Sequence, residues 1–234
     1  VSIFGEAEMK KIAVILSGCG VYDGSEIHEA VLTLLEIKKQ GADYFCFAPD
    51  KDQLHVINHT NGEEMSESRN ILVESARIAR GEIKPLSQLN VSDFDGLMLP
   101  GGFGAAKNLT TWALSGPKGD IDPEVKRVLS ESVTSATPVA LICMSPVIMA
   151  KALEGTDVSA LLTVGNTEDP SLYEIGAISG GMESLGARAR MCGLTETIVD
   201  REHKIVTSPA YMMDVDISQV AEGIANTVKE LLTL

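Results

Sequence analysis

The stretch that decides the fold is PVALICMSP, residues 138–146, in which an apolar run leads straight into a cysteine and a helix start. Pro138 to Ile142 suit a buried strand, and Pro146 suits the first turn of a helix over about 145–154, where a missing N–H costs nothing. The sharp turn between them, a nucleophile elbow, lifts the Cys143 thiol over backbone N–H groups and a positive helix end. We therefore expect a nucleophile with a thiol pKa below the value of about 8.5 of an unstructured peptide. The alternative is a small buried apolar side chain.

The rest of the chain alternates strands with helices. An apolar run at 12–16 predicts a first strand, and Ser25 is a fair N-cap for a helix that Gly41 ends. The same patterns predict strands at 44–48, 96–99 and 138–142, helices at 70–79, 123–132 and 217–232, and a hairpin from 196–199 and 205–207. This order predicts an α/β fold, a doubly wound parallel sheet with a C-terminal hairpin.

Three loops leave strands at the carboxyl edge of this sheet, where doubly wound folds bind ligands. They span residues 17–24, 100–108 and 142–146. Gly101 and Gly102 offer backbone N–H groups without side-chain bulk, so with the Met144 N–H they can form an oxyanion site. The alternative is a tight turn that needs glycine. The glycine-rich residues 17–20 match neither phosphate-binding nor dinucleotide-binding patterns, so we predict no nucleotide and no cofactor.

Composition narrows the class of protein. The 234 residues carry a net charge of -14 with scattered Lys and Arg, which argues against nucleic acid and anionic membranes as partners. No apolar run approaches the ~20 residues needed to span a bilayer. The four cysteines show neither metal-ligand nor disulfide-scaffold spacing, which favours a reducing compartment, and we expect a cytoplasmic protein. We interpret residues 1–8 as an extension before Met9 and residues 9–234 as a single domain.

Several motifs together indicate a family. The chain reads MKKIAVILSGCGVYDGSEIHEA at 9–30, CFAPD at 46–50, ESRNILVESARIARGEI at 67–83, PGGFGAAKNL at 100–109 and KIVTSPAYM at 204–212. With the Cys143 elbow, they resemble the ElbB (enhancing lycopene biosynthesis) branch of the ThiJ/PfpI superfamily, over nearly the whole chain from Met9. The resemblance implies a flavodoxin-like fold, related to class I glutamine amidotransferases, and a homodimer.

The resemblance also implies a carboxyl partner for the thiol. In the superfamily a glutamate on the first helix hydrogen-bonds the nucleophilic cysteine, and the motif GSEIHEAV places it at Glu29. Such a carboxyl can hold the proton that the thiol releases and act as acid or base. Helical periodicity instead puts Glu29 on the solvent side, opposite a predicted apolar stripe of Ile27, Ala30, Val31, Leu34 and Leu35. Glu26 and His28 are the alternatives.

A catalytic histidine is not found where the relatives with amidotransferase or protease activity have one. Met144 follows the cysteine, and the only later histidine is His203, in a charged turn. The sequence therefore argues against those two activities, which need a Cys-His-acid triad. His55 and His59, spaced by four, would bind zinc only with further partners, so we predict no metal.

The ElbB resemblance implies a glyoxalase-like activity. Cys143 would attack a small dicarbonyl such as glyoxal, and hydrolysis of the resulting thioester would give a hydroxy acid, glycolate. The alternative is a non-enzymatic protein that uses the same thiol as an oxidation sensor or acts through a partner. Cys19 would then be a resolving cysteine, or simply a packing residue. Ser145, where the branch leads us to expect alanine, adds a hydroxyl near the thiol.

Overall fold

A seven-stranded sheet forms the centre of the computed structural model, which describes residues 8–234. The strand order is β10-β11-β7-β6-β1-β2-β5, and every neighbouring pair is parallel except β10 and β11. The strands are β1 Lys11–Ile15, β2 Asp43–Ala48, β5 Ile83–Pro85, β6 Gly96–Leu99, β7 Val139–Ile142, β10 Ile198–Asp200 and β11 Ile205–Ser208. The predicted parallel sheet and C-terminal hairpin are confirmed, whereas edge strand β5 was not predicted. Most of the predicted extension, residues 1–7, lies outside the described residues.

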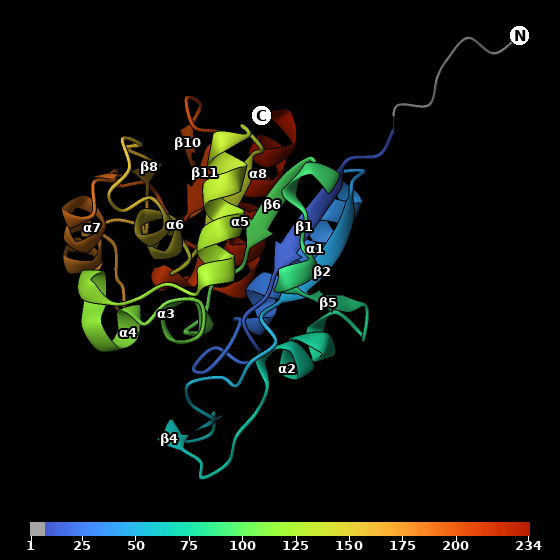
Figure 1. Cartoon of the computed structure of the whole chain (residues 1–234). Helices are drawn as coiled ribbons and strands as arrows, with labels where there is room; N and C mark the ends of the chain where they lie inside the picture. Colours follow the sequence, from blue (N-terminus) through green and yellow to red (C-terminus); the bar gives the residue numbers. More distant parts are fainter. Residues whose placement is uncertain (1–7) are drawn as a thin grey trace, which may run out of the picture.

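Helices cover both faces of the sheet. Their bounds are α1 Ile27–Lys39, α2 Ile71–Ile78, α3 Gly104–Lys107, α4 Trp112–Ser115, α5 Pro123–Thr134, α6 Pro146–Ala152, α7 Ile175–Ser184 and α8 Ile217–Thr233. Figure 1 shows α5 in front of the strands and α8 behind them; α1 packs on α8, and α5 packs on α6. Because both faces are covered, the central strands β6 and β7 are buried along their whole length, as their continuous apolar runs predict.

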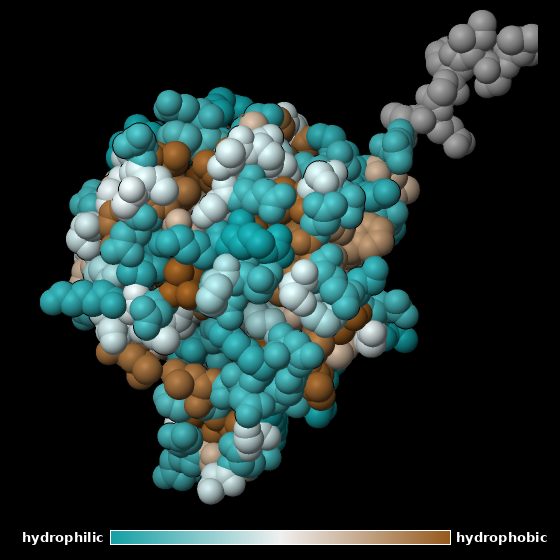
Figure 2. All heavy atoms as spheres, viewed as in Figure 1, coloured by the Kyte–Doolittle hydropathy of each residue, from teal (hydrophilic) through white to brown (hydrophobic). Residues whose placement is uncertain are grey.

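Two small sheets lie outside the central one. β3 (Ile57–Asn58) and β4 (Glu63–Glu64) form a hairpin in a segment that projects from the body of the molecule in Figure 1. β8 (Leu161–Leu162) and β9 (Arg188–Ala189) pair in parallel, and α7 lies between them along the chain. Seen from the same side, the surface is mainly hydrophilic, with apolar residues in separate patches (Figure 2). None of the helices within residues 8–234 has the length and apolar character of a membrane span.

The strand order reverses beside β1. The chain passes from β1 to β2 on one side and later returns to β6 on the other, so the ligand crevice is expected beyond the carboxyl ends of β1 and β6. The loops that follow these strands are joined by hydrogen bonds: Phe103 N donates to Val21 O (2.7 Å), and Glu26 N donates to Gly101 O (2.9 Å). The fold therefore brings the predicted loops together at one edge.

Helix α1 differs from its prediction in two ways. Its N-cap is Glu26, whose carboxylate accepts from the Glu29 N–H at 2.7 Å, while the predicted cap, Ser25, accepts from the Ser17 N–H at 2.9 Å. The predicted apolar stripe is also wrong in part, because three of its members are 42%, 47% and 48% exposed, namely Ile27, Val31 and Leu35. The helix is turned so that Glu29 faces inward.

Candidate active site

Cys143 occupies the turn between β7 and α6. Its φ of 59° lies in the left-handed region, which costs a non-glycine residue about 1–3 kcal/mol and marks functional turns. Hydrogen bonds hold the turn: Cys143 N donates to Ser208 O (2.9 Å), and the Ser145 hydroxyl donates to Pro100 O (2.7 Å). The predicted nucleophile elbow is therefore present, and Ser145 ties it to the loop that follows β6.

Glu29 lies against the thiol. Its side chain is fully buried and hydrogen-bonds Cys143. Its Oε2 also accepts from Gly101 N at 2.8 Å, and its Oε1 accepts from Tyr211 N at 3.3 Å. The first turn of α1 thus projects over the sheet edge, and the structure brings together the two residues that the family resemblance paired. Helical periodicity had indicated the opposite orientation for Glu29.

Burial changes the titration of both groups. It raises the pKa of Glu29 to about 8, with the charge on Glu26 as a second cause. Burial and the nearby Glu29 charge raise the pKa of the Cys143 thiol well above its usual value, which corrects the lowered pKa that the sequence predicted. At neutral pH Glu29 is therefore mainly protonated, and so is the Cys143 thiol. The two groups titrate as a coupled pair.

Backbone N–H groups complete the surroundings of the sulfur. Those of Gly102 and Met144 hydrogen-bond the Cys143 side chain and oppose the rise in its pKa. A Cβ on Gly101 would lie 2.3 Å from Cys143 Cβ and 2.7 Å from Glu29 Oε2, and Gly102 has a φ of +98°. Glycine is therefore needed at 101 for close approach and at 102 for the turn. The tight-turn alternative describes this loop. Among the predicted oxyanion donors, the Gly101 N–H is taken up by Glu29 Oε2, while the Gly102 and Met144 N–H groups face the sulfur.

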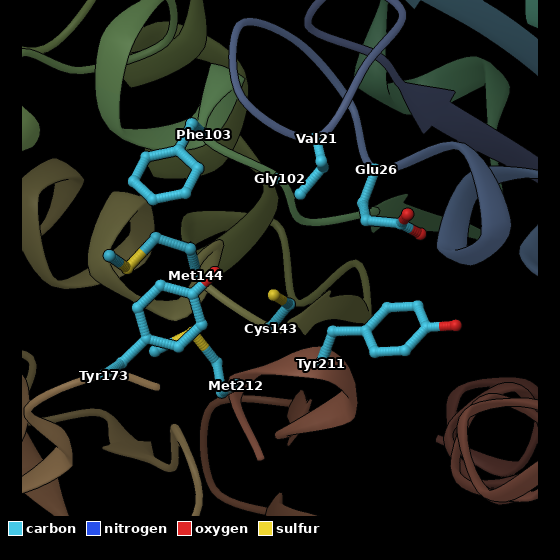
Figure 3. Close-up of a pocket in the computed structure, with 9 residues that line it drawn as sticks. All are labelled: Val21, Glu26, Gly102, Phe103, Cys143, Met144, Tyr173, Tyr211 and Met212. Carbon is cyan, nitrogen blue, oxygen red and sulfur yellow. The ribbon is translucent and has the colours of Figure 1, made fainter. Parts of the chain in front are cut away.

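A pocket opens over the sulfur. Its enclosed volume is only about 20 Å³, and Cys143 lies near the centre of the view with its sulfur toward the cavity, 5% exposed (Figure 3). The lining residues are Val21, Glu26, Gly102, Phe103, Cys143, Met144, Tyr173, Tyr211 and Met212. The mostly apolar lining and small size suit a compact, uncharged molecule.

Sequence reasoning missed five pocket residues, namely Val21, Phe103, Tyr173, Tyr211 and Met212. Val21 lies within the motif quoted at 9–30. Phe103 and the pair Tyr211 and Met212 lie within the quoted motifs PGGFGAAKNL and KIVTSPAYM, which gave a signal for them. Tyr173 lies in a segment without periodicity or motif, and nothing in the sequence marks it.

Two secondary candidates lie outside this pocket lining. His28 is exposed, and its Nδ1 lies 2.8 Å from the Tyr211 hydroxyl. Cys19 is half-buried near Glu74 and Arg77 of α2, and burial raises the pKa of its thiol. The structure therefore brings neither to the Cys143 sulfur.

The remaining metal and thiol candidates have structural surroundings. The His59 ring nitrogens contact Tyr22 N (3.2 Å) and Ile57 O (3.0 Å). Over residues 8–234 there is no group of three His, Cys, Asp or Glu side chains able to hold a metal ion. Cys46 and Cys192 are buried free thiols, consistent with packing roles.

Known proteins resemble this chain over nearly its whole length. No family model matches the chain. The chain is 44% identical over 226 residues to a rat protein named ES1 protein homolog, mitochondrial, covering 96% of this chain and 84% of the relative. It is 42% identical over 226 residues to the human glutamine amidotransferase-like class 1 domain-containing protein 3, mitochondrial, covering 96% and 83%.

A solved structure extends the similarity to three dimensions. An isoprenoid biosynthesis protein with an amidotransferase-like domain from Ehrlichia chaffeensis matches with a TM-score of 0.85 and 34% identity, covering 95% of this chain and 99% of that one. More distant structures described as ThiJ/PfpI or DJ-1 proteins match with TM-scores of 0.51 to 0.55 and at most 18% identity, which shows a shared fold alone.

Proposed function

Since the chain belongs to the family of ES1 and ElbB proteins, class I glutamine amidotransferase-like members of the ThiJ/PfpI superfamily, we propose that it is a cofactor-independent glyoxalase-like enzyme. Its substrate would be a small dicarbonyl such as glyoxal, and its product a hydroxy acid such as glycolate. The observation that carries this proposal is the position of the Cys143 sulfur, between the Glu29 carboxyl and the Gly102 and Met144 N–H groups, at the floor of a small pocket.

The first step is addition of the thiol to one aldehyde. The ionised form of Glu29 takes the proton of the Cys143 thiol, so the sulfur attacks as thiolate beside a protonated carboxyl. The new C–S bond forms as the aldehyde C=O π bond breaks, which leaves an alkoxide. The Gly102 and Met144 N–H groups stabilise this oxyanion where it develops, and the proton of the Glu29 carboxyl then converts it to the hemithioacetal.

The second step moves hydrogen between carbons. Glu29, ionised after giving up its proton, removes the C–H proton of the hemithioacetal carbon, and the electron pair forms an enediol. Return of a proton to the neighbouring carbon gives a hydroxyacyl thioester on Cys143. Water then cleaves the C–S bond, which releases glycolate and restores the thiol. The sequence is an isomerisation followed by hydrolysis, so it needs no external oxidant or reductant.

This scheme assigns every proton transfer to Glu29; the second nearby carboxyl, Glu26, lines the pocket and accepts from the Glu29 N–H. The nine residues that line the pocket include no histidine. A carboxyl whose pKa burial raises to about 8 can both accept and donate protons near neutral pH, which is the requirement for one group acting in both directions. This property supports glyoxalase-like chemistry over amide hydrolysis by a triad.

The test compares glycolate release from glyoxal by the wild-type protein and by Cys143→Ala, with Cys46→Ala as a matched thiol control on β2. The proposal expects Cys143→Ala to lose activity and Cys46→Ala to keep it. Equal rates for wild type and Cys143→Ala would remove Cys143 from the mechanism.

A second proposal uses the same thiol without turnover, as an oxidation sensor or through a partner. The absence of histidine from the pocket lining favours it, because relatives of the triad type need one for efficient catalysis. Mild peroxide would then convert Cys143 to sulfenic or sulfinic acid before Cys46 or Cys192 reacts. Peptide mass spectrometry distinguishes this outcome from uniform oxidation.

Two further proposals concern the cellular compartment of the protein and its oligomeric state. We propose a cytoplasmic protein, supported by four free cysteines; the names of the rat and human relatives carry the word mitochondrial. We also propose a homodimer, with the exposed stripe of Ile27, Val31 and Leu35 on α1 as the surface that a second copy covers.

A further inference from the structure

Tyr173 differs from the other polar side chains of the pocket in having an unused donor. Across residues 8–234 no hydrogen bond involves its hydroxyl, whereas its backbone N–H donates to Ser171 Oγ at 2.9 Å and its carbonyl accepts from Ile175 N at 3.0 Å. By contrast, the Tyr211 hydroxyl lies 2.8 Å from His28 Nδ1, and Glu26 Oε2 accepts from the Glu29 N–H. Tyr173 therefore offers the one pocket hydroxyl free to donate to a bound molecule.

The ring of Tyr173 is held in place by its neighbours. It packs against the Phe103 ring with centroids 6.0 Å apart and an interplanar angle of 56°. Ser171 anchors the segment, since its Oγ also donates to Met212 O at 2.6 Å. Figure 3 shows the ring beside Met144 with the hydroxyl directed into the pocket. A donor fixed in this way loses little entropy when it binds a substrate.

The hydroxyl is a donor at working pH. Burial raises the pKa of Tyr173 to about 12, and negative charge on Cys143 and Glu29 contributes to the rise. The phenol therefore stays protonated at neutral pH and above, so it can donate a hydrogen bond and cannot serve as a general base.

We propose that Tyr173 donates a hydrogen bond to the second carbonyl oxygen of a 1,2-dicarbonyl, and is thereby the residue with which the pocket distinguishes a dicarbonyl from a simple aldehyde. This inference rests on the proposed function. When Cys143 Sγ bonds to the first carbon, the Gly102 and Met144 N–H groups take the first oxygen. The second carbonyl then extends from the sulfur into the pocket, whose free donor is the Tyr173 hydroxyl.

The same contact acts during proton transfer. As Glu29 removes the proton from the first carbon, the electron pair forms a C=C bond and negative charge moves to the second oxygen. A protonated phenol at that oxygen stabilises the charge where it develops. Loss of the hydroxyl should therefore lower kcat by a larger factor than it raises KM.

The test uses Tyr173→Phe with methylglyoxal and propanal, which differ only in the second carbonyl oxygen. The measurement is protection of Cys143 from iodoacetamide by each compound, read by peptide mass spectrometry. For each compound, protection in the variant is divided by protection in the wild type, so the intrinsic reactivity of the aldehyde cancels. We expect methylglyoxal protection to weaken roughly 2- to 12-fold, the loss of one neutral hydrogen bond, and propanal protection to stay unchanged.

Tyr44→Phe on β2 is the matched control and should change neither value. Equal weakening for both compounds, or no change with methylglyoxal, would overturn the role of Tyr173. This test can fail independently of the proposed function. If Tyr173→Phe weakens protection by methylglyoxal alone, while the wild type releases no lactate from methylglyoxal, Tyr173 is a dicarbonyl-recognition residue and the proposed turnover is rejected. Turnover that Tyr173→Phe leaves intact would reject Tyr173 alone.

Discussion

Gly101→Ala tests how tightly the reactive pair is packed. The added Cβ would lie 2.3 Å from Cys143 Cβ, 2.7 Å from Glu29 Oε2 and 2.9 Å from Cys143 Sγ. All three contacts are shorter than atoms tolerate, and both neighbours are held by buried hydrogen bonds. Gly101 does not have a positive φ, so alanine is acceptable to the backbone and crowding is the effect under test.

The size of the effect follows from these contacts. Overpacking of a buried site costs about 1–3 kcal/mol. For a chain of 234 residues each kcal/mol lowers Tm by roughly 2–4 °C, so we expect a fall of about 2–12 °C. Displacement of Glu29 from the sulfur by even a fraction of an ångström should also lower kcat/KM for glyoxal, by about 10- to 100-fold.

Thermal unfolding and glycolate release from the same preparations provide the assay. Gly180→Ala in α7 is the control, since no atom lies within 4 Å of its added Cβ, and it should keep full activity with unchanged or slightly higher stability. Wild-type Tm and wild-type activity in Gly101→Ala would refute the packing argument.

Three further changes have defined outcomes. Glu29→Gln should alter how the free energy of unfolding depends on pH. The pKa of Glu29 is about 8 in the folded protein and near 4.5 in the unfolded chain, so the wild type becomes less stable as the pH rises from 4.5 to 8. Relative to the variant, this loss amounts to roughly 5 kcal/mol at most. Urea unfolding at pH 5 and pH 8 checks this, and a constant difference contradicts it. Ser145→Ala leaves the Pro100 carbonyl unpaired and should cost about 1–3 kcal/mol in urea unfolding, whereas exposed Ser68→Ala should cost nothing measurable; equal stability of the two variants would argue against the tether. Val31→Glu should convert a dimer to monomers in sedimentation analysis while Val73→Glu on α2 does not, and an unaffected assembly would exclude the α1 stripe as the interface.

The sequence predicted the sheet well because its strands are buried on both sides. The runs at 12–16, 96–99 and 138–142 are continuously apolar, and burial of each large side chain stabilises the fold by about 1.5–3 kcal/mol. The elbow was also predictable, since a strand, a cysteine and a helix-starting proline follow one another without a break.

The orientation of α1 could not be predicted from periodicity. A hydrophobic stripe shows which helix face is apolar, but neighbouring elements decide which face is covered. In α1 the buried side includes Glu29, Thr33 and Glu36, while Val31 and Leu35 remain exposed. The family motif, rather than the helical pattern, located Glu29. The raised thiol pKa was likewise beyond the sequence, because it depends on how deeply the elbow is buried.

The most direct test of the central claim is detection of the acyl intermediate on Cys143. Wild-type protein mixed with glyoxal and quenched in acid within the turnover time would be digested and examined by mass spectrometry. The account predicts a hydroxyacetyl group on the peptide that contains Cys143, released by hydroxylamine as expected for a thioester. Glycolate formation with Cys143 unmodified at every time point would contradict it.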